Sequence, residues 1–419
     1  MTKTKCACSE NTTCLPVLNV VVFSIGQEYT GSMKINKAYS YRLKPTAEQT
    51  TQFEVYAGHC RFVWNKCWQL SLFRLQNRQK IMYYQEMDFF SKLWKRSDEY
   101  GFLKQCPAHC IQQKLRDLER AFRDCFDKSQ PGKRLPTKRK KNIHDSFRFP
   151  EPKQIEIEHG RIKLPKIGWV KFFHSQNIVG SIRNATISRK GNYWFVSICV
   201  EQELILPTQL PTSAIGIDVG IANFAALSNG VLIAPINSLK TYAGRLAILQ
   251  RRLAKKQKFS SNWKKVVVKL RKLHRKIALI RRDHVHKLST NLSKSHAMVA
   301  VEALKITNMS KSAKGSIDKP GNSVRAKSGL NKAILDQGWG EFRRQLKYKL
   351  EWSKGTYVEV APQYTSQKCA KCGNTNKANR KSQDRFCCTS CYYSEHADIN
   401  AAMNILAAGH VAMACGASA

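Results

Sequence analysis

Two pairs of cysteines near the carboxyl end place the strongest constraint on how this chain folds. Each pair is separated by two residues, fifteen residues lie between the pairs, and the four positions are Cys369, Cys372, Cys388 and Cys391. Four thiolates at this spacing are typical of a zinc ribbon, in which one tetrahedral Zn²⁺ holds two short loops together. The sequence therefore predicts a structural zinc site within residues 365–391.

An acidic residue follows this ribbon closely. Asp398 lies seven residues past Cys391, at the start of the run ADINAAMNIL, whose apolar pattern predicts a short buried helix. From the spacing alone, Asp398 fits a helix cap and a functional carboxylate equally well.

The charge of the chain indicates its partner. Its 419 residues include 71 Lys and Arg against 29 Asp and Glu, giving a formal charge of +42 spread along the whole length. Such an excess favours a polyanion, and nucleic acid fits best. No apolar run approaches the roughly twenty residues of a membrane span, so we expect no membrane partner. Fifteen cysteines, an odd number, indicate free thiols in a reducing cell interior.

The first half of the chain predicts a sheet interrupted by helices. Residues 1–32 differ in composition from the rest and are interpreted as an extension outside the fold. A strand at 39–43 precedes a helical region, 46–139, whose aromatic stripe from Phe53 to Leu75 is interpreted as core and not as a base-stacking surface. Alternating segments between turn signals at 146–205 predict an antiparallel barrel that the first strand joins. The basic run at 133–142 is explained equally well by a localisation signal or solvated loop and by phosphate contact.

Two further carboxylates end apolar strands in the second half. Residues 214–233 predict three strands, with Asp218 in the first, and Glu302 ends the segment AMVAVE. A carboxylate in an apolar strand is costly unless it binds something, although an Asp capping a turn would look the same. Between them a basic amphipathic stretch, 240–295, favours a helical hairpin along a nucleic-acid backbone over a calmodulin-type target. The polar segment at 310–330 predicts a mobile loop.

Several motifs in this order resemble the TnpB family, transposon-encoded nucleases related to type V CRISPR effectors. They span residues 33–412 and read MKINKAYSYRLKPTAEQ, GIDVG, LKITNM, GWGEFRRQLKYKLEW, YTSQKCAKCG and HADINAAMNI. The resemblance implies a multidomain α/β fold: a β-barrel (33–45 with 140–205), a helical recognition lobe (46–139), an RNase H-like RuvC nuclease domain (206–364 with 392–412), an inserted zinc ribbon (365–391) and a tail (413–419).

The resemblance also implies an activity. Asp218, Glu302 and Asp398, which are 84 and 96 residues apart, would together form the RuvC site of an RNA-guided DNA endonuclease. Hard carboxylate oxygens select Mg²⁺ or Mn²⁺, and two such ions can hydrolyse a phosphodiester. The implied partners are a guide RNA from the transposon end and double-stranded target DNA, bound by a monomer in the prokaryotic cytoplasm, at the nucleoid.

Two other functions remain open at this point. A cleavage-dead, RNA-guided repressor of the same family would bind the same partners, but all three acidic positions are occupied here. The second alternative is a transposase-type protein: the missing tyrosine or DDE signature disfavours a strand-transferring enzyme, and an accessory, transposase-type DNA-binding protein stays open.

Overall fold

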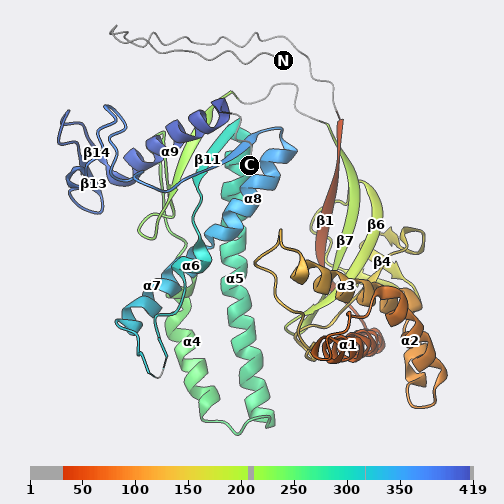
Figure 1. Cartoon of the computed structure of the whole chain (residues 1–419). Coiled ribbons are helices and arrows are strands. Elements are labelled where there is room, and N and C mark those ends of the chain that lie inside the picture. The colour runs from red at the N-terminus through yellow and green to blue at the C-terminus, as the bar shows by residue number, and fades with distance from the viewer. Residues whose placement is uncertain (1–31, 206–211, 317, 416–419) are drawn as a thin grey trace.

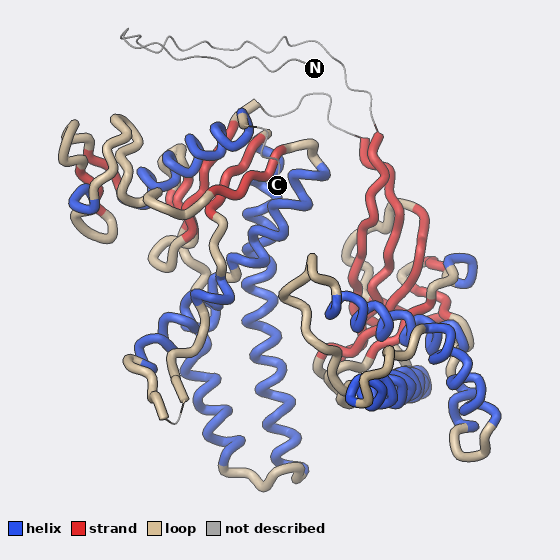
Figure 2. The backbone as a smooth tube through the Cα atoms, in the orientation of Figure 1, coloured by secondary structure: helices blue, strands red, loops and turns tan. Residues whose placement is uncertain are grey.

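The computed structural model describes residues 32–205, 212–316 and 318–415. The predicted extension at 1–32 lies outside this range except for its last residue. The described part forms two bodies, which Figure 1 shows side by side. Figure 2 shows that each contains its own group of strands with helices packed against it. None of the described helices is both long and apolar enough to span a membrane.

The amino-terminal body is built on a seven-stranded antiparallel sheet with three helices. Its strands pair side by side in the order β2-β6-β7-β1-β5-β4-β3, and no pairing between β2 and β3 occurs among the described residues. The antiparallel prediction is therefore confirmed, and closure into a barrel stays a prediction. The elements are β1 (Ser32–Lys44), α1 (Ala47–Gln76), α2 (Tyr84–Arg96), α3 (Ala108–Phe126), β2 (Ser146–Phe149), β3 (Glu156–Glu158), β4 (Arg161–Leu164), β5 (Gly168–Phe172), β6 (Ser181–Lys190) and β7 (Tyr193–Ile205).

Helix α1 and this sheet share one hydrophobic core. Thr46 and Gln49 form a capping box that starts the helix, and Phe53 and Trp64 on its inner face are almost fully buried. The Phe53 ring meets the edge of Trp194 from β7, with ring centroids 5.2 Å apart. The aromatic stripe is therefore core, as the sequence predicts.

The carboxyl-terminal body is built on a five-stranded mixed sheet, β10-β9-β8-β11-β12. The first three strands form an antiparallel meander, whereas β8, β11 and β12 run parallel. The predicted strands around Asp218 and Glu302 are confirmed. The elements are β8 (Ala214–Val219), β9 (Ala225–Leu227), β10 (Leu232–Ile233), α4 (Ser238–Ala254), α5 (Ser261–Ser295), β11 (Met298–Glu302), α6 (Ile306–Met309), α7 (Val324–Gln337), α8 (Trp339–Trp352), β12 (Thr356–Val360), β13 (Arg385–Cys387), β14 (Ser394–His396) and α9 (Ala397–Ala414).

Side chains alternate strictly across this sheet. Ile215 and Ile217 of β8 pack into the core formed with α5 and α8, whereas Ala300 of β11 packs on the opposite face with Ile405 of α9. Since side chains two residues apart share a face, Asp218 and Glu302 lie on the face that α9 covers.

The basic stretch forms two long helices, α4 and α5, which run side by side away from the sheet (Figure 1). Leu246 and Leu249 of α4 are buried against Leu273 and Ile277 of α5. The predicted helical hairpin is confirmed. Because its inner faces are apolar, most of its lysines and arginines lie on the outer faces.

Two predicted boundaries are wrong. The loop predicted at 310–330 ends earlier, because α7 starts at Val324. The apolar residue that anchors this helix, Ile334, comes only after the polar segment, so no periodicity was visible within it. The predicted tail also starts later, since α9 continues to Ala414.

Candidate metal centres

The four predicted zinc ligands converge. The sulfur atoms of Cys369, Cys372, Cys388 and Cys391 all lie within 4.8 Å of one another. Two of these separations are 3.7 Å, between Cys369 and Cys391, and 3.5 Å, between Cys372 and Cys388. Four sulfurs about 2.3 Å from a tetrahedral Zn²⁺ are about 3.8 Å apart, so the donors fit zinc in both chemistry and spacing.

Asparagine side chains fasten this ribbon to helix α9. Asn400 accepts a hydrogen bond from the backbone N–H of Ala370 and donates one to the carbonyl of Lys368. Asn404, one turn later, donates to the carbonyls of Thr365 and Lys368. The cysteine loops and the first turns of α9 therefore form one unit.

Asp218 and Glu302 lie at the carboxyl ends of neighbouring parallel strands. The register pairs Ile217 of β8 with Val301 of β11, so the two acids follow at the next position of each strand. Both are half-buried. The sheet thus brings together two carboxylates that are 84 residues apart in the sequence.

Asp398 reaches the same place because α9 lies unusually close to the sheet. A Cβ atom at Gly216 would lie 2.2 Å from the carbonyl oxygen of Ala402, so only glycine allows this approach. Asp398 precedes Ala402 by four residues and therefore shares its face of the helix.

The pKa of Asp218 responds to the charges around it. Burial, followed by the charges of Glu302 and Asp398, raises the pKa of Asp218 to about 8, and Arg380 opposes this rise. Burial also raises the pKa of Glu302, partly offset by a hydrogen bond from the Thr365 hydroxyl at 2.6 Å. Two half-buried carboxyl groups with raised pKa values, Asp218 and Glu302, make a site that favours a bound cation.

The capping interpretation of Asp398 is wrong. The side chain of His396 caps α9 by accepting a hydrogen bond from the backbone N–H of Asp398 at 3.2 Å. The Asp398 carboxylate instead pairs with the guanidinium of Arg380 at 3.3 Å. Asp398 lies in the first turn of α9 but does not cap the helix with its side chain.

The carboxylates are gathered less tightly than the thiolates. Within the described ranges, the four cysteines are the one group of three or more ligands whose donor atoms lie so close together. Glu302 and Asp398 are each engaged with a protein partner, Thr365 and Arg380. The donor set itself consists of hard carboxylate oxygens, which fit Mg²⁺ or Mn²⁺ and not zinc.

Sequence reasoning missed Arg380, Thr365 and His396. Arg380 lies in the polar loop between the cysteine pairs, where nothing local marks it out from the other basic residues. Its role depends on the docking of the ribbon on α9, which is a tertiary property. The sequence gives a weak indication of Thr365 and His396, because Thr365 lies four residues before Cys369 and His396 lies two residues before Asp398.

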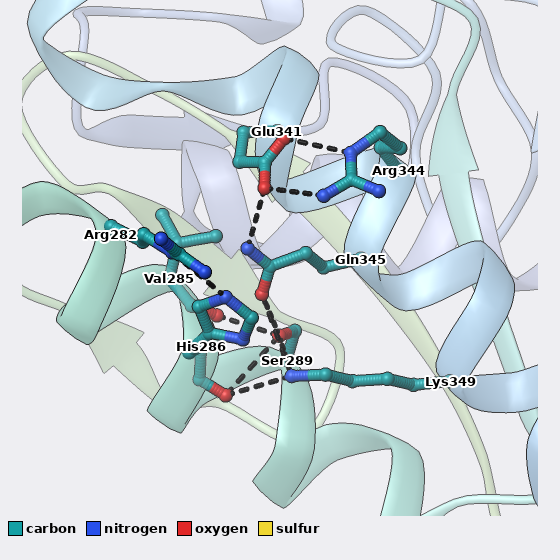
Figure 3. Close-up of polar contacts among 8 residues, drawn as sticks. All are labelled: Arg282, Val285, His286, Ser289, Glu341, Arg344, Gln345 and Lys349. Carbon is teal, nitrogen blue, oxygen red and sulfur yellow. Dashed lines mark hydrogen bonds and ion pairs between the residues drawn. The ribbon is translucent and has the colours of Figure 1, made fainter. Parts of the chain in front are cut away.

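A second polar cluster joins α5 to α8 (Figure 3). Its residues His286 and Lys349 also line a basic groove. The Lys349 ammonium donates to the Ser289 hydroxyl at 2.6 Å, the Thr290 hydroxyl at 2.7 Å and the His286 carbonyl at 2.9 Å. Burial lowers the pKa of Lys349 to about 8. The groove has a volume of about 1070 Å³ and lies between the two bodies; its cationic lining residues are Lys37, Lys190, Arg275, Arg282, Arg344 and Lys349.

Three family models match the chain. OrfB_IS605, described as "Probable transposase", matches residues 197–313, and the "Cas12f1-like, TNB domain" model matches 339–405. A helix-turn-helix model, HTH_OrfB_IS605, matches 33–80, a range that forms strand β1 and the single helix α1 here.

Curated relatives match almost the whole chain. The Escherichia coli (strain K12) protein "Putative RNA-guided DNA endonuclease InsQ" is 44% identical over 384 residues, 92% of this chain and 95% of that protein. "Putative RNA-guided DNA endonuclease" from Streptomyces pristinaespiralis is 30% identical and covers 91% of this chain and 92% of its own length. A solved structure, "Structure of the mini-RNA-guided endonuclease CRISPR-Cas_phi3", matches 92% of this chain and 93% of its own chain, with 12% sequence identity and a TM-score of 0.46. The identity to the Escherichia coli protein over nearly the full length of both chains shows that this chain belongs to the TnpB family of transposon-associated proteins.

Proposed function

We propose that this protein is an RNA-guided DNA endonuclease, encoded by a transposable element, that cuts target DNA beside a short motif read by the protein. The observation that carries the proposal is the convergence of Asp218, Glu302 and Asp398 on one edge of the mixed sheet, within electrostatic range of one another. The names of the relatives support the same activity. The antiparallel meander followed by parallel strands supports an RNase H-like, RuvC-type domain.

The three carboxylates would hold Mg²⁺ or Mn²⁺, which when bound would activate water and stabilise the leaving oxygen of the phosphodiester. The residues of the chain prepare that site. Thr365 fixes the orientation of Glu302 through its hydroxyl. Arg380 forms an ion pair with Asp398. An incoming phosphate would offer the Arg380 guanidinium a second anionic partner in place of Asp398. Asp218, whose pKa is raised, would release its proton if a divalent ion bound there.

The four cysteines would hold one zinc ion with a structural role. Zinc binding by the thiolates would stabilise the folded ribbon. The hydrogen bonds from Asn400 and Asn404 to the Lys368 carbonyl connect the ribbon to α9. With the ion bound, the contacts of Asn400 and Asn404 would hold the start of α9, and Asp398 with it, in place.

The basic groove between the two bodies is our candidate surface for guide RNA and target DNA. Arginines and lysines from β6, α5 and α8 line it. The hydrogen bonds that Gln345 and Lys349 of α8 make with Ser289 and His286 of α5, drawn in Figure 3, hold the two helices in fixed relation. Base pairing between guide and target would supply sequence specificity, so the protein needs to grip only backbone and shape. We propose that one copy of the chain suffices and that it acts at the prokaryotic nucleoid.

Reconstitution tests this function. The chain is expressed with its flanking genomic transcript, the bound RNA is sequenced, and a plasmid carrying the matching target is incubated with the complex and Mg²⁺. We expect cleavage of the matched plasmid and none of a plasmid with a scrambled target. Guided binding without cleavage would instead show a repressor, and failure to retain any RNA would refute the proposal.

A further inference from the structure

One tyrosine beside the carboxylate site has a backbone conformation that tyrosine rarely adopts. Tyr364, between β12 and the zinc ribbon, has φ of 61° and is 65% exposed. The left-handed region is uncommon for residues with a Cβ and is enriched where a structure serves a function. The conformation of Tyr364 therefore needs an explanation.

The backbone on both sides of Tyr364 is fixed. Its carbonyl accepts hydrogen bonds from the N–H groups of Gln367, at 2.9 Å, and Lys368, at 3.0 Å. The next residue, Thr365, is only 9% exposed and donates its hydroxyl to Glu302 at 2.6 Å. The position of the Tyr364 backbone is thus set by the same contacts that orient a carboxylate of the candidate site.

The side chain of Tyr364 is left without a polar or aromatic partner in the described ranges. Among the described residues, its hydroxyl has no hydrogen-bond partner and its ring no aromatic neighbour. Tyr392 makes a useful comparison, because it is 80% exposed and has φ of 57°. Its conformation belongs to the second cysteine loop, where its N–H donates to the Cys388 carbonyl, as the N–H of Gly373 donates to Cys369 in the first loop. Tyr364 is in neither cysteine loop.

A polar cavity of about 520 Å³ lies next to this segment. Its lining residues are Ser366, Gln367, Lys377, Arg380, Ser382 and Gln383. Two cations line the cavity, and one of them, Arg380, is the ion-pair partner of Asp398. The cavity therefore offers phosphate contacts directly beside the carboxylates, with an exposed aromatic ring two residues before its first lining residue.

We propose that Tyr364 is a substrate-positioning residue whose ring stacks on the base beside the scissile phosphate, while Lys377 and Arg380 receive the neighbouring phosphate of the same DNA strand. Base–aromatic stacking is tolerant of sequence, because every base offers a π-face. An enzyme that takes its specificity from a guide has to cut any sequence, and stacking suits that need. This inference rests on the proposed nuclease function.

Three substitutions separate stacking from backbone strain. Tyr364→Phe keeps the ring, Tyr364→Ala removes the ring and keeps the strain, and Tyr364→Gly removes both. Tyr392→Ala is the matched control for loss of an exposed tyrosine with positive φ. Each full-length variant is loaded with guide RNA and assayed for target binding, single-turnover cleavage and cut position. 2-Aminopurine next to the cut reports stacking on that base by fluorescence quenching.

We expect all variants to bind target as wild type does. Cleavage by Tyr364→Ala and Tyr364→Gly should fall on the order of ten-fold, with cuts spread over neighbouring positions and 2-aminopurine no longer quenched. Tyr364→Phe and Tyr392→Ala should match wild type in every assay.

Other outcomes would overturn the inference. Full cleavage and quenching by Tyr364→Ala would show that the ring does nothing. Recovery in Tyr364→Gly would assign the effect to strain, and loss in Tyr364→Phe would assign it to the hydroxyl. Wild type that binds guide and target without cutting would refute the proposed nuclease function itself, and quenching lost only in the ring-less variants would then still report stacking by Tyr364.

Discussion

Gly216 is where the geometry of the carboxylate site is most open to test. It lies two residues before Asp218, and α9 crosses it so closely that a Cβ atom would lie 2.2 Å from the Ala402 carbonyl oxygen and 2.6 Å from the Leu406 nitrogen. Both atoms belong to the helix backbone, so no side chain can rotate away. Gly216→Ala therefore forces α9 off the sheet and moves Asp398 with it.

The expected displacement follows from the distances. Real Cβ contacts are essentially never shorter than 3.0 Å, so α9 has to retreat by about 0.8 Å, the difference from 2.2 Å. Overpacking of a core costs about 1–3 kcal/mol, and a backbone clash belongs at the upper end. For a domain of this size, about 3 kcal/mol lowers Tm by roughly 6–12 °C. A misplacement near 1 Å costs about 100-fold in catalysis, so cleavage should fall by on the order of 10- to 100-fold.

Thermal unfolding and guided cleavage measure these two effects. The control is Gly244→Ala on α4, where a new Cβ would meet nothing within 4 Å and alanine favours the helix by about 1 kcal/mol. Gly244→Ala should keep wild-type cleavage with an equal or higher Tm. Wild-type Tm and cleavage in Gly216→Ala would refute the idea that close packing of α9 positions Asp398.

Three further predictions follow from the metal sites and the charge. Cys372→Ser should lose zinc by metal analysis and loosen residues up to Asp398 in hydrogen exchange, and equal damage from Cys387→Ser would contradict the ligand assignment. The pKa of Asp218 is raised to about 8, so the metal-free site holds a proton below that pH and Mg²⁺ has to displace it. The half-saturating Mg²⁺ concentration for cleavage should therefore rise by up to about ten-fold per pH unit as pH falls below 8. A half-saturating concentration that does not change with pH would contradict this. The same proton makes the metal-free fold less stable as pH rises from the ordinary carboxyl range towards 8, because the unfolded chain has already released it. Nucleic-acid affinity should fall steeply with salt, and Arg282→Ala in the basic groove should reduce the log–log slope by about 1, whereas an unchanged slope would remove that residue from the interface.

Local patterns carried the sequence predictions that succeeded. The spacing of the cysteines is enough to predict a metal-binding loop, because two thiolates separated by two residues can bind one ion from a single tight loop. The strands around Asp218 and Glu302 were equally visible, since an apolar run that ends in an acid is distinctive. These patterns identified the individual parts of the candidate site.

No local sequence pattern shows how those residues come together in the fold. The proximity of Asp218 and Asp398 depends on packing at Gly216, whose importance shows only once α9 is laid on the sheet. The same docking brings Arg380 to Asp398 from a loop with many basic residues. Helix α7 was missed in part because its anchor, Ile334, lies beyond the segment that looked like a loop. Each miss is a tertiary contact without a periodic signal.

The central claim is that three carboxylates far apart in the sequence act as one cutting site while other surfaces bind the nucleic acids. The most direct measurement pairs target binding with strand scission for Asp218→Ala, Glu302→Ala and Asp398→Ala, each loaded with guide RNA. The account predicts that all three bind target with wild-type affinity and that cleavage falls by orders of magnitude, to a similar extent in each, because residues that act as a unit are not additive. Cleavage near the wild-type rate by Asp398→Ala would contradict it, since the carboxylate beside Arg380 would then have no part in hydrolysis.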